Sequence, residues 1–402
     1  MTKLDESRNG ATTIEAGSRE PAAVKPLAGL RVLDFGTAWA GPHATETLAA
    51  LGADVVKVES RRRLDLFRAM AGIETTPGFN DINLSKRSIC IDLSTDAGRE
   101  LAQRLCAVAD VAVDNYRPGV MTRLGLDYQT LCVSNPRIIC ASVSAFGATG
   151  PEATRTGYAA IFCAMGGLAQ MTGYPDWEPA LVRSPMDLTV ANASATAILA
   201  AVWERDSTGV GGFIDVSATD VIGTLIPGAM AAWDIAQVDL TRRGNRPWGN
   251  NYLQDVYRAQ GEDSWVAVSV WTPEQSESLS TFLAAEGLGG DRCDALGSWI
   301  AVRTSKAAAS ELQDRGIPAV PTSAPSEIVA DSHLRHRAAF AETQHPVQGS
   351  LFALSPAWLV DGGREAVTRA PLLGEHTSDV LREWLDLGST ELEQLTADGV
   401  LS

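Results

Sequence analysis

The strongest constraint on the fold lies in residues 27 to 59, where a strand, a helix and a second strand follow one another. The segment "RVLDF" is rich in β-forming residues and ends at Gly36. A helical pattern follows in "GPHATETLAALGA", and "DVVKVE" is again extended. A strand-helix-strand unit with connections this short requires parallel strands joined by a right-handed crossover. The ordered part of the chain is therefore predicted to begin with a βαβ unit.

The same alternation continues through "SICIDL", "DAGRELAQRLCAVA", "DVAVDNY" and "RIICASVSAF". Strands and helices that alternate in this way predict a doubly wound, Rossmann-like α/β layer. The composition then shifts, and the end of the chain returns to a helical pattern. We expect five parts: a disordered polar leader over residues 1–25, a large α/β domain over 26–230, a linker over 231–255, an inserted smaller α+β domain over 256–345 and a segment over 346–402 that completes the large domain.

Charge and cysteine usage exclude several classes of protein. The 402 residues include 33 Lys and Arg against 49 Asp and Glu, a net charge of −16, which argues against binding to nucleic acids or anionic membranes. We find no apolar run of membrane-spanning length. The six cysteines contain no CxxC pair, which is typical of reduced thiols in a cytoplasmic protein. No metal-ligand spacing, Walker A loop or GxGxxG motif is present, so we expect no metal and no permanently bound cofactor.

The stretch "RSPMDLTVANASATAILAAVWER" places one acidic residue, Asp187, at the start of a helix predicted to run to Trp203. Asp187 is interpretable as the N-cap of that helix, where an aspartate contributes about 1 kcal/mol. It is also interpretable as a catalytic nucleophile, because a helix N-terminus favours the ionised carboxylate that a nucleophile requires. The two interpretations are compatible.

Four segments in order resemble the family III CoA-transferases, also called the CaiB/BaiF family. They are "LAGLRVLDFGTAWAGPHATETLAALGADVVKVE", "FNDINLSKRSICIDLSTDAGREL", "DVAVDNYRPGVMTRLGLDYQTLCVSNPRIICASVSAFGATGP" and "TRAPLLGEHTSDVL". The resemblance covers about residues 27 to 390. It implies an enzyme that moves CoA from an acyl-CoA to a carboxylic acid, with both as small-molecule partners. It also implies a homodimer in which the two chains interlock.

The resemblance also implies roles for individual residues. The family's nucleophilic aspartate, which forms an aspartyl-CoA thioester, matches Asp187. Because CoA is anionic, an acidic protein needs local basic groups to bind it, and the candidates are Arg61 to Arg63, Lys86, Arg87 and Arg123. The segments that approach the nucleotide in the family match Lys57, Glu59, Arg61, Lys86, Asn115 and Arg123. Trp39 and Tyr158 are predicted to line the substrate pocket, although Trp39 is also interpretable as a core residue.

Other functions stay open at this point. The α-methylacyl-CoA racemases share the fold but use a histidine and an acid where this chain has Tyr158 and Ala159, and a phenol is a poor base in place of an imidazole. A non-catalytic CoA-binding subunit of a heteromeric transferase is a second alternative, since Ser60 stands where the family often has an arginine. A nicotinamide-dependent dehydrogenase is a third, suggested only by the βαβ start.

Trp248 and Gly249 are the nearest candidates for an active-site lid.

Overall fold

The main body of the protein is a six-stranded parallel sheet with the strand order β3-β2-β1-β4-β5-β6. The computed structural model describes residues 25–246, 253–359, 363–364 and 366–401, so residues 1–24 of the predicted leader and the lid candidates Trp248 and Gly249 lie outside the described residues. The strands of the sheet are β1 (Arg31–Asp34), β2 (Asp54–Glu59), β3 (Arg87–Cys90), β4 (Val111–Asp114), β5 (Ile139–Ser144) and β6 (Gly212–Ser217). The order reverses between β1 and β4, which makes the carboxyl ends of these two strands the expected ligand-binding edge.

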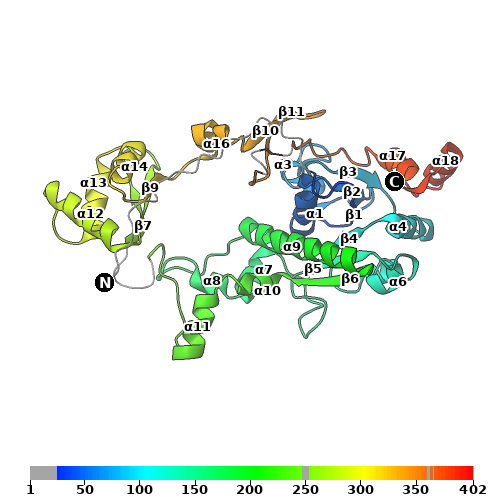
Figure 1. The fold of residues 1–402 in the computed structure, drawn as a ribbon, viewed down its shortest axis with the longest axis horizontal. Coiled ribbons are helices and arrows are strands. Elements are labelled where there is room, and N and C mark those ends of the chain that lie inside the picture. Colours follow the sequence, from blue (N-terminus) through cyan, green and yellow to red (C-terminus); the bar gives the residue numbers. More distant parts are fainter. Residues whose placement is uncertain (1–24, 247–252, 360–362, 365, 402) are drawn as a thin grey trace, which may run out of the picture.

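Helices cover both faces of this sheet (Figure 1). On one face, α4, α6 and α17 bury a large apolar cluster that includes Leu33, Leu105 and Trp384. On the other face, α1 packs against α9, and Leu48 and Ile198 contribute to a second cluster. The helices up to β7 are α1 (Ala40–Ala50), α2 (Leu66–Ala71), α3 (Pro77–Asn80), α4 (Asp96–Val108), α5 (Val120–Leu124), α6 (Tyr128–Ser134), α7 (Ala159–Met165), α8 (Leu168–Met171), α9 (Ser184–Thr208), α10 (Ala218–Gly223) and α11 (Pro227–Ala236). The described structure thus has the Rossmann-like α/β layer that the alternating pattern predicts.

A second, smaller body has its own antiparallel sheet, in the order β7-β8-β9. Its elements are β7 (Leu253–Arg258), β8 (Trp265–Val270), α12 (Pro273–Ala285), α13 (Arg292–Ala301), α14 (Ser305–Gln313) and β9 (Ala319–Pro321). The three helices close a separate apolar core around Val268, Leu296 and Trp299. Strand β7 begins inside the segment predicted as a linker, and α11 occupies the start of that segment.

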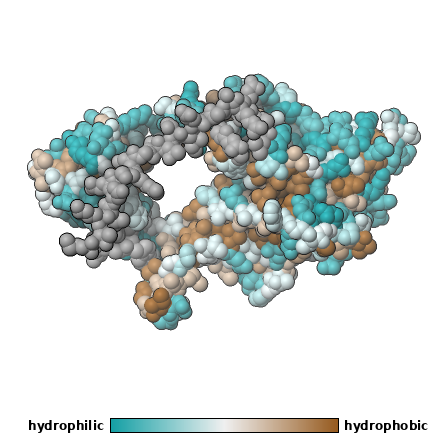
Figure 2. All heavy atoms as spheres, in the orientation of Figure 1, coloured by the Kyte–Doolittle hydropathy of each residue, from teal (hydrophilic) through white to brown (hydrophobic). Residues whose placement is uncertain are grey.

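Two connections join the bodies, one after α11 and the other through α16 and the β10–β11 hairpin (Figure 1). Open space remains between the two bodies in the space-filling view (Figure 2). The second connection and the C-terminal part contain α15 (Pro325–Ala330), α16 (Ser332–His336), β10 (Phe340–His345), β11 (Gly349–Leu354), α17 (Thr377–Leu385) and α18 (Ser389–Ala397). The chain therefore leaves the large body and returns to it, where α17 packs against β3 and α4.

Helix α9 requires two corrections to the sequence-based expectations. It begins at Ser184, three residues before Asp187, and ends at Thr208, where Gly209 adopts a left-handed conformation with φ of 78°. Pro185 in its first turn explains the earlier start, because the proline ring presets a helical φ. The helix is also long and apolar enough to cross a membrane by length and composition, contrary to our expectation that no such run exists. In the structure it is a core helix that buries Val190, Ala191 and Ile198 against the sheet and α1.

Candidate active site

The loop after β1, residues 36–39, lies at the strand-order reversal and is fixed from three sides. Asn115 holds Thr37 with two hydrogen bonds, accepting from its backbone N–H at 2.8 Å and donating to its carbonyl at 2.7 Å. Lys57 donates to the Gly36 carbonyl at 2.8 Å. The Asp65 carboxylate accepts from the Ala38 N–H at 3.2 Å, and Ala38 has the left-handed φ of 57°. The loop is thus held rigid at the edge where ligands bind in open α/β sheets.

Gly36 is required by this close packing. A Cβ at this position would lie 2.8 Å from an Asp34 carboxylate oxygen and 2.9 Å from the Pro42 ring. A side chain at position 36 would therefore displace either the start of α1 or the buried Asp34. This explains in physical terms why the strand "RVLDF" ends at a glycine.

A cavity of about 770 Å³ opens beside this loop and contains Asp187. We call it the Asp187 cavity. Trp39, Asn115, Arg123 and Tyr158 also line it, so the structure brings these four sequence-predicted residues together with the predicted nucleophile. Asp187 is the one acidic residue in the described lining, whereas the arginines that contribute to it are Arg63, Arg117, Arg123, Arg155 and Arg183.

Asp187 itself does not cap its helix. The N-cap position belongs to Arg183, and Asp187 lies within the first turn, so the N-cap interpretation is wrong. The side chain is partly buried, and this burial raises the pKa of Asp187 to about 6. Desolvation therefore outweighs the helix N-terminus, which we expected to favour the ionised form. At pH 7 most of the carboxyl groups at this position are still ionised.

A second cavity of about 550 Å³, which we call the Arg62 cavity, adjoins the first. Eight residues line both: Thr37, Ala38, Arg63, Leu66, Tyr116, Val120, Arg123 and Tyr158. The two cavities thus form one continuous groove across the carboxyl ends of β1, β2 and β4. Arg62 is exposed, and its guanidinium lies 2.9 Å from the Asp92 carboxylate at the wall of this cavity. A long ligand with a charged end and a reactive end fits such a groove.

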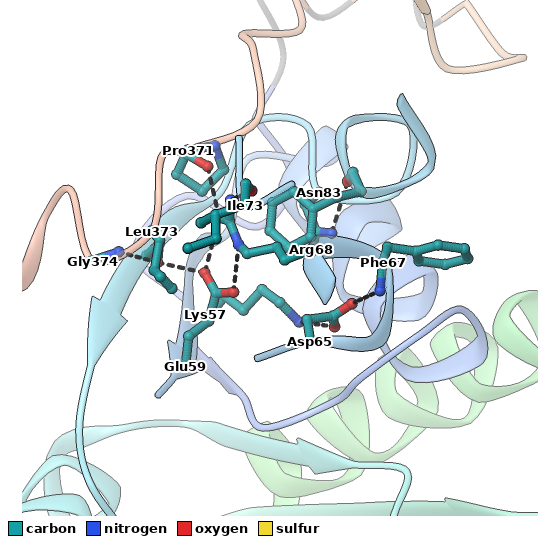
Figure 3. Close-up of polar contacts among 12 residues, drawn as sticks. Lys57, Glu59, Asp65, Phe67, Arg68, Ile73, Asn83, Pro371, Leu373 and Gly374 are labelled. Carbon is teal, nitrogen blue, oxygen red and sulfur yellow. Dashed lines mark hydrogen bonds and ion pairs between the residues drawn. The ribbon is translucent and has the colours of Figure 1, made fainter. Parts of the chain in front are cut away.

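Lys57 and Glu59 line the Arg62 cavity from a buried network of paired charges (Figure 3). Arg68 binds the Glu59 carboxylate through Nε at 2.8 Å and Nη2 at 3.1 Å, and its guanidinium stacks on Phe79. Lys57 forms an ion pair with Asp65 at 3.4 Å. Burial alone disfavours the charge on Lys57, but the neighbouring carboxylates raise its pKa above the ordinary value. These side chains shape the cavity wall, and their charges are already neutralised within the protein.

Two of the predicted nucleotide-binding residues lie apart from both cavities. Lys86 is fully buried, and its ammonium contacts the Asp34 carboxylate at 2.8 Å, the Pro42 carbonyl at 2.6 Å and the Asn83 side chain at 2.9 Å. With three acceptors in place, Lys86 has no donor left for a ligand. Arg61 donates to the Leu373 carbonyl at 3.3 Å. The structure therefore gives both residues contacts that support the groove from outside its lining.

The sequence analysis missed several residues of the site. Arg117, Arg155 and Arg183 line the Asp187 cavity, yet isolated arginines in loops give no spacing signal. Arg68 was also missed, because its partners Glu59 and Glu74 lie 9 and 6 positions away, spacings that match neither a helix nor a strand periodicity. Asp114 precedes Asn115 at the end of β4 and lines neither cavity; burial raises its pKa to about 7, and its carboxylate accepts from Ser142 at 3.3 Å.

Comparison with known proteins identifies the family. The model of CoA-transferase family III matches residues 27–377. The chain belongs to this family. It is 30% identical to the succinyl-CoA:glutarate CoA-transferase of Mus musculus, over 94% of this chain and 91% of the relative. It is also 30% identical to the formyl-CoA:oxalate CoA-transferase of Streptomyces avermitilis, over 94% and 100%.

A solved structure supports the same assignment. A CAIB/BAIF family protein from Brucella suis superposes with a TM-score of 0.80 at 30% identity, covering 90% of this chain and 99% of the other. The protein is therefore a family III CoA-transferase, as the four sequence segments predict, and its substrates are CoA thioesters. This membership removes the dehydrogenase alternative.

Proposed function

We propose that this enzyme transfers CoA from an acyl-CoA donor to a carboxylic acid acceptor, with Asp187 as its covalent nucleophile. The observation that carries the proposal is the position of Asp187, the one acidic group in the described lining of a cavity to which five arginines contribute. No ion pair within the described residues neutralises it. A partly desolvated carboxylate with a pKa near 6 is ionised at neutral pH and ready to attack an acyl carbon.

The chemistry proceeds in balanced steps. The Asp187 carboxylate attacks the donor thioester carbonyl, the C–S bond breaks, and a mixed anhydride and the CoA thiolate are formed. The thiolate then attacks the Asp187 carbonyl and releases the donor acid, which leaves CoA as a thioester on Asp187. The acceptor carboxylate repeats both steps in reverse. The thioester is conserved throughout, so the reaction needs no nucleoside triphosphate.

The groove suggests how CoA is oriented. The exposed guanidiniums of Arg62, Arg63 and Arg123 lie in the Arg62 cavity and suit the phosphates of the nucleotide. The acyl end then extends past Tyr116 into the Asp187 cavity, toward Trp39 and Tyr158. Lys57 and Glu59 shape the wall, whereas Arg61 and Lys86 support it. This revises the contacts that the family resemblance alone implies.

We also propose that the small body is an inserted domain and that two chains interlock as a homodimer. The two connections and the open space between the bodies suit a second chain that threads through (Figures 1 and 2). Helix α11 supports this arrangement, because Met230, Trp233 and Ile235 are 62%, 48% and 84% exposed, and apolar surface of this kind usually marks an interface. The six free cysteines agree with a cytoplasmic enzyme.

The test of the covalent step is direct. The purified enzyme is incubated with an acyl-CoA and no acceptor, and its mass is measured intact and after digestion. We expect the mass of CoA on the peptide that contains Asp187, and its replacement by a hydroxamate when hydroxylamine is added. Transfer activity without any adduct on this peptide would contradict the proposal.

The same preparation separates the remaining alternatives. A racemase would exchange the substrate α-hydrogen for deuterium in heavy water without any acceptor acid. A non-catalytic subunit would form no adduct alone and would gain activity when a second, related chain is added.

A further inference from the structure

A pair of aromatic rings forms part of the wall of the Asp187 cavity. Trp39 and Phe67 meet edge to face, with ring centroids 5.4 Å apart and an interplanar angle of 86°. Both residues line the Asp187 cavity, and neither lines the Arg62 cavity. The pair therefore lies at the end of the groove where an acyl group would meet Asp187, away from the end that suits the nucleotide.

The surroundings of the two rings restrict their movement. Phe67 packs against α3, where a Cβ on Gly78 would lie 3.1 Å from the Phe67 ring. Trp39 directly precedes α1, and its carbonyl accepts from the His43 N–H at 2.9 Å. The Trp39 indole N–H has no hydrogen-bond partner among the described residues. The orientation of the indole therefore depends on packing, to which the edge-to-face contact with Phe67 contributes.

A single carboxylate, that of the buried Asp65, fixes the backbone of both aromatic residues. Its Oδ1 accepts from the Phe67 N–H at 2.9 Å (Figure 3). Its Oδ2 accepts from the N–H of Ala38, the residue before Trp39, at 3.2 Å. Ala38 has a left-handed φ of 57°, which is uncommon for a residue with a side chain and persists where the surrounding structure holds it. The spacing of the two rings thus depends on Asp65.

Other apolar residues of the same lining belong to the core. Val143, Phe162 and Val190 line the Asp187 cavity and are buried members of one apolar cluster. A larger cavity on that side would require the core to open. Trp39 and Phe67 are only half-buried, so their rings are the part of the wall whose size can change while the core stays intact.

We propose that Trp39 and Phe67 limit the bulk of the acyl group that reaches Asp187, and that Asp65 is the positioning residue that fixes them. This inference rests on the proposed function, because it takes Asp187 as the group that attacks the thioester. An apolar wall discriminates between acyl groups by the room that it leaves, and one methylene group changes kcat/KM by about 10- to 200-fold. A bulky acyl group reacts slowly because the two rings must separate to admit it.

The experiment measures how fast CoA is attached to Asp187 from two thioesters, without an acceptor acid. Butyryl-CoA and cyclohexylacetyl-CoA both carry a CH₂ group beside the reacting carbonyl, so they differ in bulk and little in intrinsic reactivity. We expect the second-order rate constant of the wild type to be at least about tenfold lower for cyclohexylacetyl-CoA. Phe67→Leu should raise the ratio of the two rate constants, cyclohexylacetyl-CoA over butyryl-CoA, about tenfold.

Phe282→Leu is the matched control. Phe282 meets Trp299 edge to face, at 4.9 Å and 86°, in the core of the small body and outside the described lining of both cavities. The same substitution in this second pair should leave the ratio at its wild-type value.

A variant of Asp65 tests its role as a positioning residue. Asp65→Asn keeps one acceptor oxygen, so either the Ala38 N–H or the Phe67 N–H loses its acceptor. The ratio of the two rate constants should rise severalfold, by less than in Phe67→Leu. A residue with a merely structural role would lower both rate constants alike, and an unchanged ratio would overturn the assignment of Asp65.

The remaining outcomes separate this inference from the proposed function, with succinyl-CoA as a third thioester. Equal rate constants for the two probes in the wild type, or an unchanged ratio in Phe67→Leu, would overturn the inference. An adduct on Asp187 from succinyl-CoA and from neither probe would also overturn it and leave the proposed function standing. No adduct on Asp187 from any of the three thioesters would refute both.

Discussion

Two groups of charged residues surround the same groove, one mostly buried behind its wall and the other in the lining of the Asp187 cavity, and they differ in one respect. In the buried network each charge meets an opposite one: Arg68 contacts Glu59 and Glu74, and Lys86 contacts Asp34. In the Asp187 cavity, by contrast, Arg183 and Asp187 have no ion-pair partner among the described residues. The charges of the first group are paired with one another inside the protein. The charges of the second group are unpaired and can bind a ligand.

This difference shows why residue type alone is a poor guide to function. Lys57, Glu59 and Lys86 are residues that the family resemblance implies for nucleotide binding, yet each has an oppositely charged partner inside the protein. A buried ion pair adds little to stability by itself, but removing one partner leaves an uncompensated charge and costs about 3–5 kcal/mol. The two groups should therefore respond to substitution in opposite ways.

The largest effect is expected from Asp187→Asn. The change keeps the shape of the side chain but removes the carboxylate that attacks the thioester, so transfer should fall by three or more orders of magnitude, about 4 kcal/mol or more of transition-state free energy. The melting temperature and the affinity for CoA should stay near those of the wild type, as measured by calorimetry. Because Asp187 is not an N-cap, no loss of helix stability is expected. An active Asp187→Asn enzyme would place the nucleophile elsewhere.

The second-largest effect is a loss of stability, which we expect for the buried network and not for the lining of the cavities. Arg68→Met leaves Glu59 and Glu74 without their buried partner, so we expect the free energy of unfolding to fall by about 3–5 kcal/mol, measured by urea denaturation. Arg62→Met is the matched control, because Arg62 is 64% exposed and its partner, the buried Asp92 carboxylate, keeps two hydrogen bonds from Ser94. It should change stability by less than about 1 kcal/mol and weaken CoA binding instead. Equal stability losses in both variants would remove the distinction between the two groups.

The smallest expected effect is the dependence of the rate of adduct formation on pH. Burial raises the pKa of Asp187 to about 6, and only the ionised carboxylate attacks. The rate of adduct formation from acyl-CoA should therefore be constant above pH 7 and fall about tenfold for each pH unit below 6. This half-reaction avoids titration of the acceptor acid. A rate that stays level down to pH 4.5 would show that Asp187 keeps an ordinary pKa near 3.8.

The large-scale fold could be predicted from the sequence because the signals for its strands and helices are local. The glycine after "RVLDF", the helix that follows and the strand "DVVKVE" are all determined by neighbours in the chain, and the structure has β1, α1 and β2 where they are expected. The start of α9 was misplaced because Pro185 extends the helix beyond Asp187. The second connection is also more structured than the pattern suggests, since it carries α16 and a β-hairpin.

The site was less accessible to prediction. The resemblance identified Asp187, Trp39, Asn115, Arg123 and Tyr158, all of which line one cavity. It could not separate a paired lysine from a free one, since Lys86 is neutralised by Asp34, 52 positions away. It also gave no sign of Arg183 as a cavity residue. Pairing depends on three-dimensional neighbours, which periodicity and motif spacing do not encode.

The contacts made by the returning C-terminal segment have a consequence for the timing of folding. Arg68 donates to the carbonyl of Pro371, 303 positions later (Figure 3). The Gly374 N–H donates to the Ser88 hydroxyl across 286 positions. At about 5–20 residues per second, a ribosome needs roughly 15–60 s to synthesise the chain between Arg68 and its distant acceptor. Until then the wall around Glu59 is incomplete, and closing so large a loop slows folding further. The CoA groove is thus finished only when translation is nearly over.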